Sequence, residues 1–509
     1  MPGDEITKHI LLFGAGKSAT VLIEYLKILS SEKNWRVTVA DNNVVAVRNK
    51  IGYHKNMIAA EIDVVNINER QQYIQSADLV ISLLPPHLHY FIATDCLQFK
   101  KHLLTASYVD DQVKKLAGEI ERSNILFLYE MGLDPGIDHM SAMQMIDDIK
   151  NRGGKIVSFK SHCGGLVAPE SDDNPWHYKI SWNPKNIVMA GKAGAHYKEN
   201  GEEVKLNYNQ LFSIDHHVTV PGIGSYSYYP NRDSLSYLPN YNLGDINTFM
   251  RTTLRHPDFC FGWKNIVDLK LTDEERVYET DGMTISDFFK KHFKKHGFSE
   301  WLTQLLSSRL EYAKKMMEQL MNLMQAEQEA IEEGQEPEDD FMMIDEKGEL
   351  TSLNVDEVKS RAAESVAVQM HEANLTLKQL FFLGLNDEIF IDKGLCSAAD
   401  VLQFILETKL ALHQHDKDMI IMLHEIEYII AGEKSLIKSW LAVKGVDSVH
   451  TAMAKTVGLP LGIAAKLILE EKINLKGLHI PVSNAIYNPV LKELKQYGVA
   501  FSEEDKSIR

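Results

Sequence analysis

The sequence has little of what secreted, metal-binding or nucleic-acid-binding proteins contain. Its 509 residues include only four cysteines, which lie far apart and form no CxxC motif: Cys96, Cys163, Cys260 and Cys396. This spacing argues against a disulfide framework and a zinc knuckle, and it fits the reduced thiols of a cytoplasmic protein. The formal net charge is −17 and no arginine-rich run occurs, so nucleic acid is not an expected partner.

Long apolar runs are also missing. The best stretch, residues 456–469, is interrupted by Pro460 and Lys466, so no membrane span is expected. The N-terminal segment MPGDEITK is acidic, without the basic and apolar regions of a signal peptide or the Arg/Ser bias of a transit peptide. We expect a cytoplasmic chain of two or three globular domains, with an ordinary 44% of hydrophobic residues.

The sequence does contain a glycine turn between a strand-like run and a helix-like run. Residues 9–13 are mostly apolar, GAG follows, and residues 17–30 have a helical pattern. Gly14 permits the tight turn, Gly16 leaves space for a pyrophosphate, and Ala19 lets the helix pack closely against the strand. The free N–H groups of the helix N-terminus favour phosphate there. The pattern predicts a dinucleotide site, and a βα turn without a ligand is the alternative.

A second strand-like run, residues 36–40, ends in Asp41. A carboxylate in this place can accept hydrogen bonds from a ribose 2′-hydroxyl and would repel a 2′-phosphate. Asp41 therefore predicts NAD in preference to NADP. The neighbouring Asn42 and Asn43 could take over part of the ribose contact.

The first 150 residues alternate between β-like and α-like segments. Six apolar runs lie near residues 10–13, 36–40, 61–65, 78–84, 102–106 and 125–129, with helix-compatible segments between them. This alternation predicts an α/β fold with a Rossmann-type, doubly wound parallel sheet, whose ligands bind at the carboxyl ends of the strands. The predicted cofactor-binding residues lie in the turns at those ends: Gly14, Gly16, Lys17, Ser18, Ala19, Asp41, Leu83, Leu84, Pro85 and Asp134.

The rest of the chain has a different character. We expect an α+β substrate domain over residues 151–284, to which residues 416–447 return, and a mainly helical domain over residues 285–415. Residues 327–349 are acidic and contain few core-forming side chains, which predicts an exposed insertion. The final segment, residues 448–509, is predicted to contain two amphipathic helices and a short strand.

Several polar side chains stand outside the periodic pattern. Asp134 is expected to point into the cleft, whereas Asp138 is expected to cap a helix. Cys163 follows a strand-like run and is expected to line a pocket rather than to act as a nucleophile. Arg232 and Arg255 can each make a two-pronged contact with a carboxylate, although a surface ion pair is the commoner role of arginine.

Two histidines, His87 and His89, have an HxH spacing without a third ligand nearby, so no metal site is predicted.

Taken together, these motifs resemble the saccharopine dehydrogenase family, in its L-glutamate-forming branch, and the dehydrogenase half of the bifunctional aminoadipic semialdehyde synthase. The resemblance extends from residue 14 to residue 491, and the matching motifs occur in family order. They are GAGKSA, DLVISLLPPHLH, TASYVD, GLDPGIDHMSAM, HCGGLVAPESDDNPWHYKISW, YPNRDS, TLR, AMAKTVGLPLGIAAKLI and KGLHIPVSNAIYNPVL. Residues 327–349 and their flanks match nothing in the family pattern.

The resemblance implies a homodimer with a dinucleotide domain, an α+β domain that holds the substrate and dimer contacts, and a helical domain over the cleft. It also implies that the C-terminal segment returns to the dinucleotide domain. Asp134, Tyr108 and Cys163 would lie near the reacting centre. The implied contacts with saccharopine are Ser107, Tyr108, Arg232, Thr253, Leu254 and Arg255.

The implied reaction is the oxidation of saccharopine, with NAD and water, to L-glutamate and 2-aminoadipate 6-semialdehyde. NADP is the alternative cofactor. Two other functions remain open: an NADPH-dependent reductase that forms a related secondary amine (saccharopine itself or a carboxynorspermidine-type product), and a dinucleotide-binding regulator without turnover. Arg232 and Arg255 together favour a substrate with several carboxylates.

Overall fold

The fold was analysed in a computed structural model. It describes residues 7–213, 216–298, 300 and 350–508, together with parts of segment 304–344. The chain divides into two compact units. The first comprises residues 1–173, 177–260 and 410–509, and the second comprises residues 174–176 and 261–409.

The first unit contains a parallel sheet of seven strands in the order β20-β6-β5-β4-β1-β2-β3. This is the order of a dinucleotide-binding fold, extended by one strand from the C-terminal segment. The strands are β1 (His9–Phe13), β2 (Arg36–Asp41), β3 (Met57–Glu61), β4 (Leu79–Ser82), β5 (His102–Thr105), β6 (Leu126–Leu128) and β20 (Gly477–His479). The Rossmann-type fold is confirmed.

The helices of this half also follow the expected segments. They are the short 3-10 helix η1 (Lys17–Ala19), α1 (Thr20–Glu32), α2 (Val44–Ile51), α3 (Ile67–Ser76), α4 (His89–Gln98), α5 (Asp111–Lys115), α6 (Ala117–Arg122) and α7 (Ile137–Asn151). One predicted element was wrong. The third strand was expected at residues 61–65 but ends at Glu61, and the apolar Ile62 and Val64 are buried in the loop that follows.

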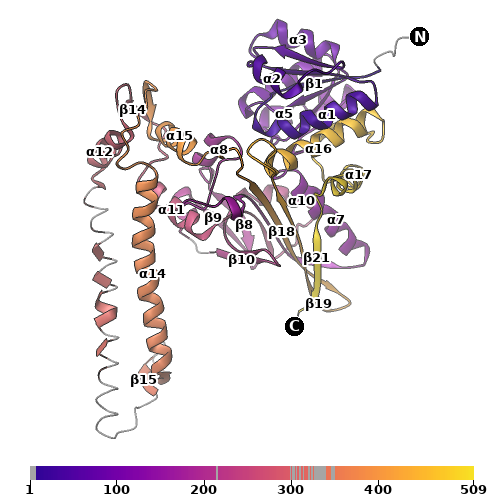
Figure 1. The fold of residues 1–509 in the computed structure, drawn as a ribbon. Coiled ribbons are helices and arrows are strands. Elements are labelled where there is room, and N and C mark those ends of the chain that lie inside the picture. The colour runs from indigo at the N-terminus through magenta and orange to yellow at the C-terminus, as the bar shows by residue number, and fades with distance from the viewer. Residues whose placement is uncertain are drawn as a thin grey trace. The chain divides into compact units, whose positions relative to one another are not determined.

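Helix α16 (Ala452–Leu469) lies alongside α1 (Figure 1). A Cβ atom at Gly458 would come within 2.9 Å of the Leu22 amide nitrogen, so glycine permits this close approach. Helix α16 is long and apolar enough to cross a membrane, but 83% of it is buried inside the fold. It is therefore best explained as a core helix of this unit.

A second, mixed sheet of ten strands completes the first unit. Its main path runs β10-β11-β13-β7-β18-β19-β21, and β8, β9 and β12 pair off this path. The long strands of the path are β7 (Lys155–Val167), β18 (Asp418–Ile430), β19 (Glu433–Lys444) and β13 (Thr248–Arg255). The others are β8 (Ala195–Glu199), β9 (Glu202–Leu206), β10 (His216–Val220), β11 (Gly224–Pro230), β12 (Arg232–Asp233) and β21 (Ser502–Ser507).

In the second unit the longest helix whose bounds the structure describes is α14 (Val355–Phe382), and α12 (Ile285–His296) and α15 (Ala398–Lys409) accompany it. Helix α11 (Pro257–Asp268) begins in the first unit and continues into the second. Two small sheets pair β14 (Arg276–Glu279) with β17 (Leu395–Ser397), and β15 (Asp340–Ile344) with β16 (Leu350–Asn354). The expected acidic insertion, residues 327–349, lies outside the described residues except for β15, where the sequence predicted no strand.

Candidate active site

The glycine turn has the geometry that a dinucleotide needs. Gly14 has a φ of +93°, and a Cβ atom there would lie 2.8 Å from the Leu83 carbonyl oxygen. Gly16 is exposed, and a Cβ atom there would meet nothing within 4 Å, so its backbone faces open space. Lys17 is exposed and Ser18 half-buried in η1, while Ala19 is buried. Leu83, Leu84 and Pro85 follow β4, and the Leu83 amide donates to the Phe13 carbonyl oxygen.

Asp41 connects the end of β2 to the glycine turn. One of its carboxylate oxygens accepts from the Ala15 amide at 2.8 Å, and the other accepts from the Asn43 amide at 2.9 Å. The sequence did not single out Lys50, whose Nζ donates to the Gly16 carbonyl oxygen at 2.6 Å and to the Thr20 hydroxyl at 2.9 Å. A carboxylate and an ammonium group thus lie on either side of the turn, and the donor set fits a dinucleotide.

A hydrogen-bonded chain of three side chains lies at the ends of β4 and β5. The buried His89 bonds to the Ser82 hydroxyl through Nδ1 at 2.8 Å and to the Ser107 hydroxyl through Nε2 at 2.7 Å. Burial lowers the pKa of His89 to about 4, so the ring is neutral near pH 7. A neutral ring has one donor and one acceptor, which determines how the Ser107 hydroxyl is oriented.

Tyr108 and Arg232 lie together. The Arg232 guanidinium is 5.1 Å from the centre of the Tyr108 ring, and Arg232 itself has a left-handed backbone with a φ of +52°. Asp233, the carboxylate next to Arg232 in the sequence, pairs instead with His196 at 3.2 Å. Among the described residues, Arg232 forms no ion pair. Burial and the nearby Asp134 raise the pKa of Tyr108, so its phenol stays protonated at neutral pH.

Asp134 belongs to a buried carboxylate–guanidinium–carboxylate group. The Arg251 guanidinium donates to Asp134 at 2.5 Å and to Asp138 at 2.7 Å. Burial raises the pKa of Asp134 to about 6, against the opposing charge of Arg251. Burial also acts to raise the pKa of Asp138, but His139, Arg251 and the Gly136 amide outweigh it and lower that pKa. The two carboxylates are thus unequal, and Asp134 is the one that can exchange a proton near neutral pH.

A polar network behind this group was not predicted from the sequence. His139 bonds to Glu130 at 2.9 Å and to the Tyr241 hydroxyl at 2.6 Å, and the Tyr237 hydroxyl donates to Glu130 at 3.0 Å. The Arg251 guanidinium lies 4.5 Å from the centre of the Tyr237 ring. Arg251 could have been found from the sequence. Alternate residues of a strand share one face, and Arg251 lies two and four residues before the candidates Thr253 and Arg255. Tyr237 and Tyr241 are about a hundred residues from Glu130, so nothing in the sequence indicated that they join this network.

The remaining candidates lie where β7 and β13 pair. Cys163 is opposite Thr253 and is buried, which raises the pKa of its thiol, so Cys163 is not an activated nucleophile. Thr253 is half-buried and Leu254 is fully buried. A Cβ atom at Gly164 would lie 2.6 Å from the Leu254 carbonyl oxygen, which explains the glycine there.

Arg255 is buried without a carboxylate. Its guanidinium lies 5.2 Å from the Tyr178 ring and 5.4 Å from the Phe259 ring, and one nitrogen donates to the Leu254 carbonyl oxygen at 2.8 Å. Its Nε is buried without a hydrogen-bond partner in the described part of the chain, where Arg255 also forms no ion pair. A buried guanidinium that has no acidic partner can bind an anionic ligand.

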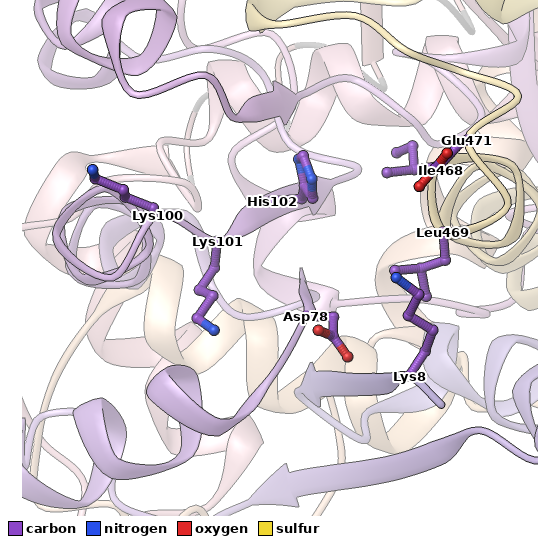
Figure 2. Close-up of a pocket in the computed structure, with 8 residues that line it drawn as sticks. All are labelled: Lys8, Asp78, Lys100, Lys101, His102, Ile468, Leu469 and Glu471. Carbon is purple, nitrogen blue, oxygen red and sulfur yellow. The ribbon is translucent and has the colours of Figure 1, made fainter. Parts of the chain in front are cut away.

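One cavity lies away from these residues. It has a volume of about 280 Å³ and is found at the amino ends of the parallel strands, beside Lys8, Asp78 and His102 (Figure 2). Lysines and acidic side chains are mixed in its lining. The predicted cofactor residues lie at the opposite, carboxyl ends of the same strands, so this cavity is not the candidate site.

Comparison with known proteins gives a consistent result. The family model described as saccharopine dehydrogenase C-terminal domain matches residues 132–499, and the saccharopine dehydrogenase NADP binding domain matches residues 10–128. The alpha-aminoadipic semialdehyde synthase of Arabidopsis thaliana is 30% identical over 529 residues, covering 98% of this chain and 45% of that protein. The chain thus spans about half the length of this relative.

Single-enzyme relatives match over almost their whole length. The saccharopine dehydrogenase [NADP(+), L-glutamate-forming] of Saccharomyces cerevisiae is 29% identical, over 98% of this chain and 99% of that protein. The solved structure of the apo, L-Glu-forming saccharopine dehydrogenase from the same yeast has the same fold, with a TM-score of 0.74 and 24% identity, over 98% of this chain and 100% of that one. The resemblance inferred from the motifs is confirmed. The expected preference for NAD is not supported, because both the family model and the yeast enzyme are named for NADP.

Proposed function

The chain belongs to the saccharopine dehydrogenase family of oxidoreductases, and we propose that it oxidises saccharopine to L-glutamate and 2-aminoadipate 6-semialdehyde. One observation carries this proposal: Arg232 and Arg255 form no ion pair among the described residues, and Arg232 lies near the buried Asp134. Saccharopine has three carboxylates on a secondary amine. Two cations without acidic partners suit such a substrate better than they suit a polyamine.

The geometry supports a division of roles between the side chains. Arg232 and Arg255 bind carboxylates of the substrate, and Ser107, oriented by His89, donates or accepts a hydrogen bond beside them. Asp134, whose pKa is about 6, is mostly ionised near pH 7 and can take a proton from the substrate ammonium group. Tyr108 and Cys163 stay protonated, because their pKa values are raised by burial. They act as neutral groups that line the site.

A bound nicotinamide dinucleotide would supply a hydride acceptor for the carbon next to the amine nitrogen. Loss of that hydride from the neutral amine leaves an iminium ion, which keeps the N–H proton, and water adds to its carbon. The resulting carbinolamine breaks its C–N bond to release glutamate and the aldehyde, and the two protons that the water lost pass to the leaving nitrogen. Arg251 holds the Asp134 carboxylate in place throughout.

For the cofactor, the names of the relatives support NADP, whereas Asp41 is the residue of this chain that acts against a 2′-phosphate. We propose that the preference is set by the balance between the Asp41 carboxylate and the Lys50 ammonium group on either side of the glycine turn. A cytoplasmic location and a homodimer remain predictions, which microscopy of a tagged chain and light scattering can test.

The test of the proposed function is an absorbance assay of cofactor reduction with saccharopine, run with NAD and NADP. We expect turnover with saccharopine and at least a tenfold lower kcat/KM with a secondary amine that lacks one carboxylate. Turnover only of aldehyde plus a polyamine would support the carboxynorspermidine-type alternative instead. Cofactor binding without turnover of any of these would support a regulator.

A further inference from the structure

Four side chains of the first unit form a cluster apart from the site described above. Asp172 and His177 belong to the segment after β7, while His256 and Asp258 lie at the junction of β13 and α11. His177 Nδ1 lies 2.6 Å from an Asp172 oxygen, and His177 Nε2 lies 3.3 Å from an Asp258 oxygen. The His177 and His256 rings stack with their centres 3.9 Å apart. We call these four residues the His177 cluster.

We propose that the His177 cluster binds a divalent cation of the Zn²⁺ type, with His177, His256 and Asp258 as its ligands. One ligand atom from each of the three residues lies within 4.8 Å of the others. Zn²⁺ binds imidazole nitrogen and carboxylate oxygen at roughly 2.0–2.1 Å, so neighbouring ligand atoms of a tetrahedral site are about 3.3 Å apart. The separation between His177 Nε2 and Asp258 already has that value, whereas the stacked His256 ring, whose centre lies 3.9 Å from that of His177, must turn for its nitrogen to face the same ion.

Asp172 occupies the position of an outer-shell partner. A metal-bound histidine commonly donates its other ring N–H to a carboxylate, which fixes the tautomer and orients the ring. The 2.6 Å contact between Asp172 and His177 Nδ1 is such an arrangement, and it leaves Nε2 directed to Asp258. The second Asp172 oxygen is buried and has no hydrogen-bond partner within the described residues. The imidazole of His177 thus joins two carboxylates, and a divalent cation would balance their charge.

Solvent can reach the cluster. The side chain of His177 is 31% exposed, and those of Asp172 and Asp258 are 22% and 20% exposed. An ion can therefore enter without unfolding the unit. It would fix the residues next to the Arg255–Tyr178 stack, because His256 follows Arg255 and His177 precedes Tyr178. The proposal does not depend on the proposed oxidation of saccharopine, and its test needs no substrate.

The test measures binding of Co²⁺ and Zn²⁺ to the full chain after dialysis against a chelator. We expect one equivalent of Co²⁺ to give the visible d–d absorption of a tetrahedral site, and Zn²⁺ to displace it. Asp258→Asn and His177→Gln should abolish this absorption, and Asp172→Asn should weaken binding roughly 10- to 100-fold. The matched control is His415→Ala, which removes an exposed histidine of the same unit and should change nothing.

Circular dichroism checks that each variant is folded. If a variant does not fold, the Co²⁺ stoichiometry and spectrum of the wild-type chain still decide between the outcomes. The proposal is overturned if the wild-type chain shows no tetrahedral Co²⁺ absorption, or if folded Asp258→Asn and His177→Gln bind Co²⁺ as tightly as the wild type. The cluster would then be an imidazolium ion held between two carboxylates.

Discussion

At the scale of single residues, the account depends most on Arg232. Truncating one partner of a desolvated charge pair costs roughly 2–5 kcal/mol, so Arg232→Ala should raise the KM for saccharopine by tens of fold or more. The Tm should hardly change, because Arg232 forms no ion pair among the described residues and only lies over the Tyr108 ring. Steady-state kinetics and thermal melting check both statements.

Two further variants sharpen this test. Arg232→Lys should restore KM only in part, because an ammonium group cannot make a two-pronged contact. Arg122→Ala, which removes an exposed arginine from α6, is the control and should leave KM unchanged. A sharp fall in Tm for Arg232→Ala with an unaltered KM would mean that Arg232 is structural.

The raised pKa of Asp134 predicts the acid limb of the pH profile. Its carboxyl is protonated below a pH of about 6 and ionised above it, and only the ionised form can accept a proton. We expect kcat/KM for saccharopine to rise with pH through about 6 and then to level off. Asp134→Asn should be slow and should lack this limb. An unchanged limb in Asp134→Asn would assign it to another group.

The cofactor preference should respond to the two charges beside the glycine turn. Asp41→Ser removes a carboxylate that repels a 2′-phosphate, so the ratio of kcat/KM for NADP to that for NAD should rise at least tenfold. Lys50→Met removes the ammonium group and should lower the same ratio. The ratio is insensitive to a general loss of activity, so it separates specificity from damage to the turn. Equal ratios in all three proteins would refute the proposed balance.

At the scale of elements, the close packing of α16 on α1 gives a stability prediction. In Gly458→Ala the new Cβ atom would lie 2.9 Å from a backbone nitrogen of α1, which cannot move away alone. Overpacking of this kind typically costs about 1–3 kcal/mol, partly offset by the better helix propensity of alanine. Urea unfolding should show the loss, whereas Gly118→Ala, where only the end of an arginine side chain is near, should not show it.

The acidic insertion is expected to be dispensable for catalysis. Residues 327–349 include β15, which pairs only with β16 in the described part of the chain and joins neither large sheet. Replacing the insertion with a short Gly/Ser linker should leave kcat within a few-fold of the parent value. Loss of activity in a folded variant would place the insertion in the site or in a dimer contact.

The elements also show what the sequence could predict. The parallel sheet was predictable because local apolar runs, turns and helices repeat in order, and the one error, at β3, arose where Ile62 and Val64 are buried without being in a strand. Asp41 ends β2 and Ser107 follows the end of β5, where the alternation of strands and helices predicted them. The pairing of β7 with β18 was not predictable, because these strands are more than two hundred residues apart in the sequence.

The same reason limits prediction of the site. Asp134 was expected to point into the cleft. Its partner Arg251, which also donates to Asp138, lies more than a hundred residues away in the sequence, so this contact could not be predicted. The contacts of His89 with Ser82 and Ser107 also depend on how β4 and β5 lie in the sheet. Residue type and spacing indicated candidate groups, and tertiary packing determined which of them are neutral, charged or unpaired.

At the scale of the whole molecule, the central claim is that this chain converts saccharopine and water into two products with reduction of one cofactor. The most direct measurement is the product ratio, with glutamate, aldehyde and reduced cofactor quantified in one reaction of the wild-type chain. The account predicts one glutamate and one aldehyde for each cofactor reduced, and almost no product with Arg232→Ala at low saccharopine concentration. Cofactor reduction without glutamate, or no reaction with either cofactor, would contradict it.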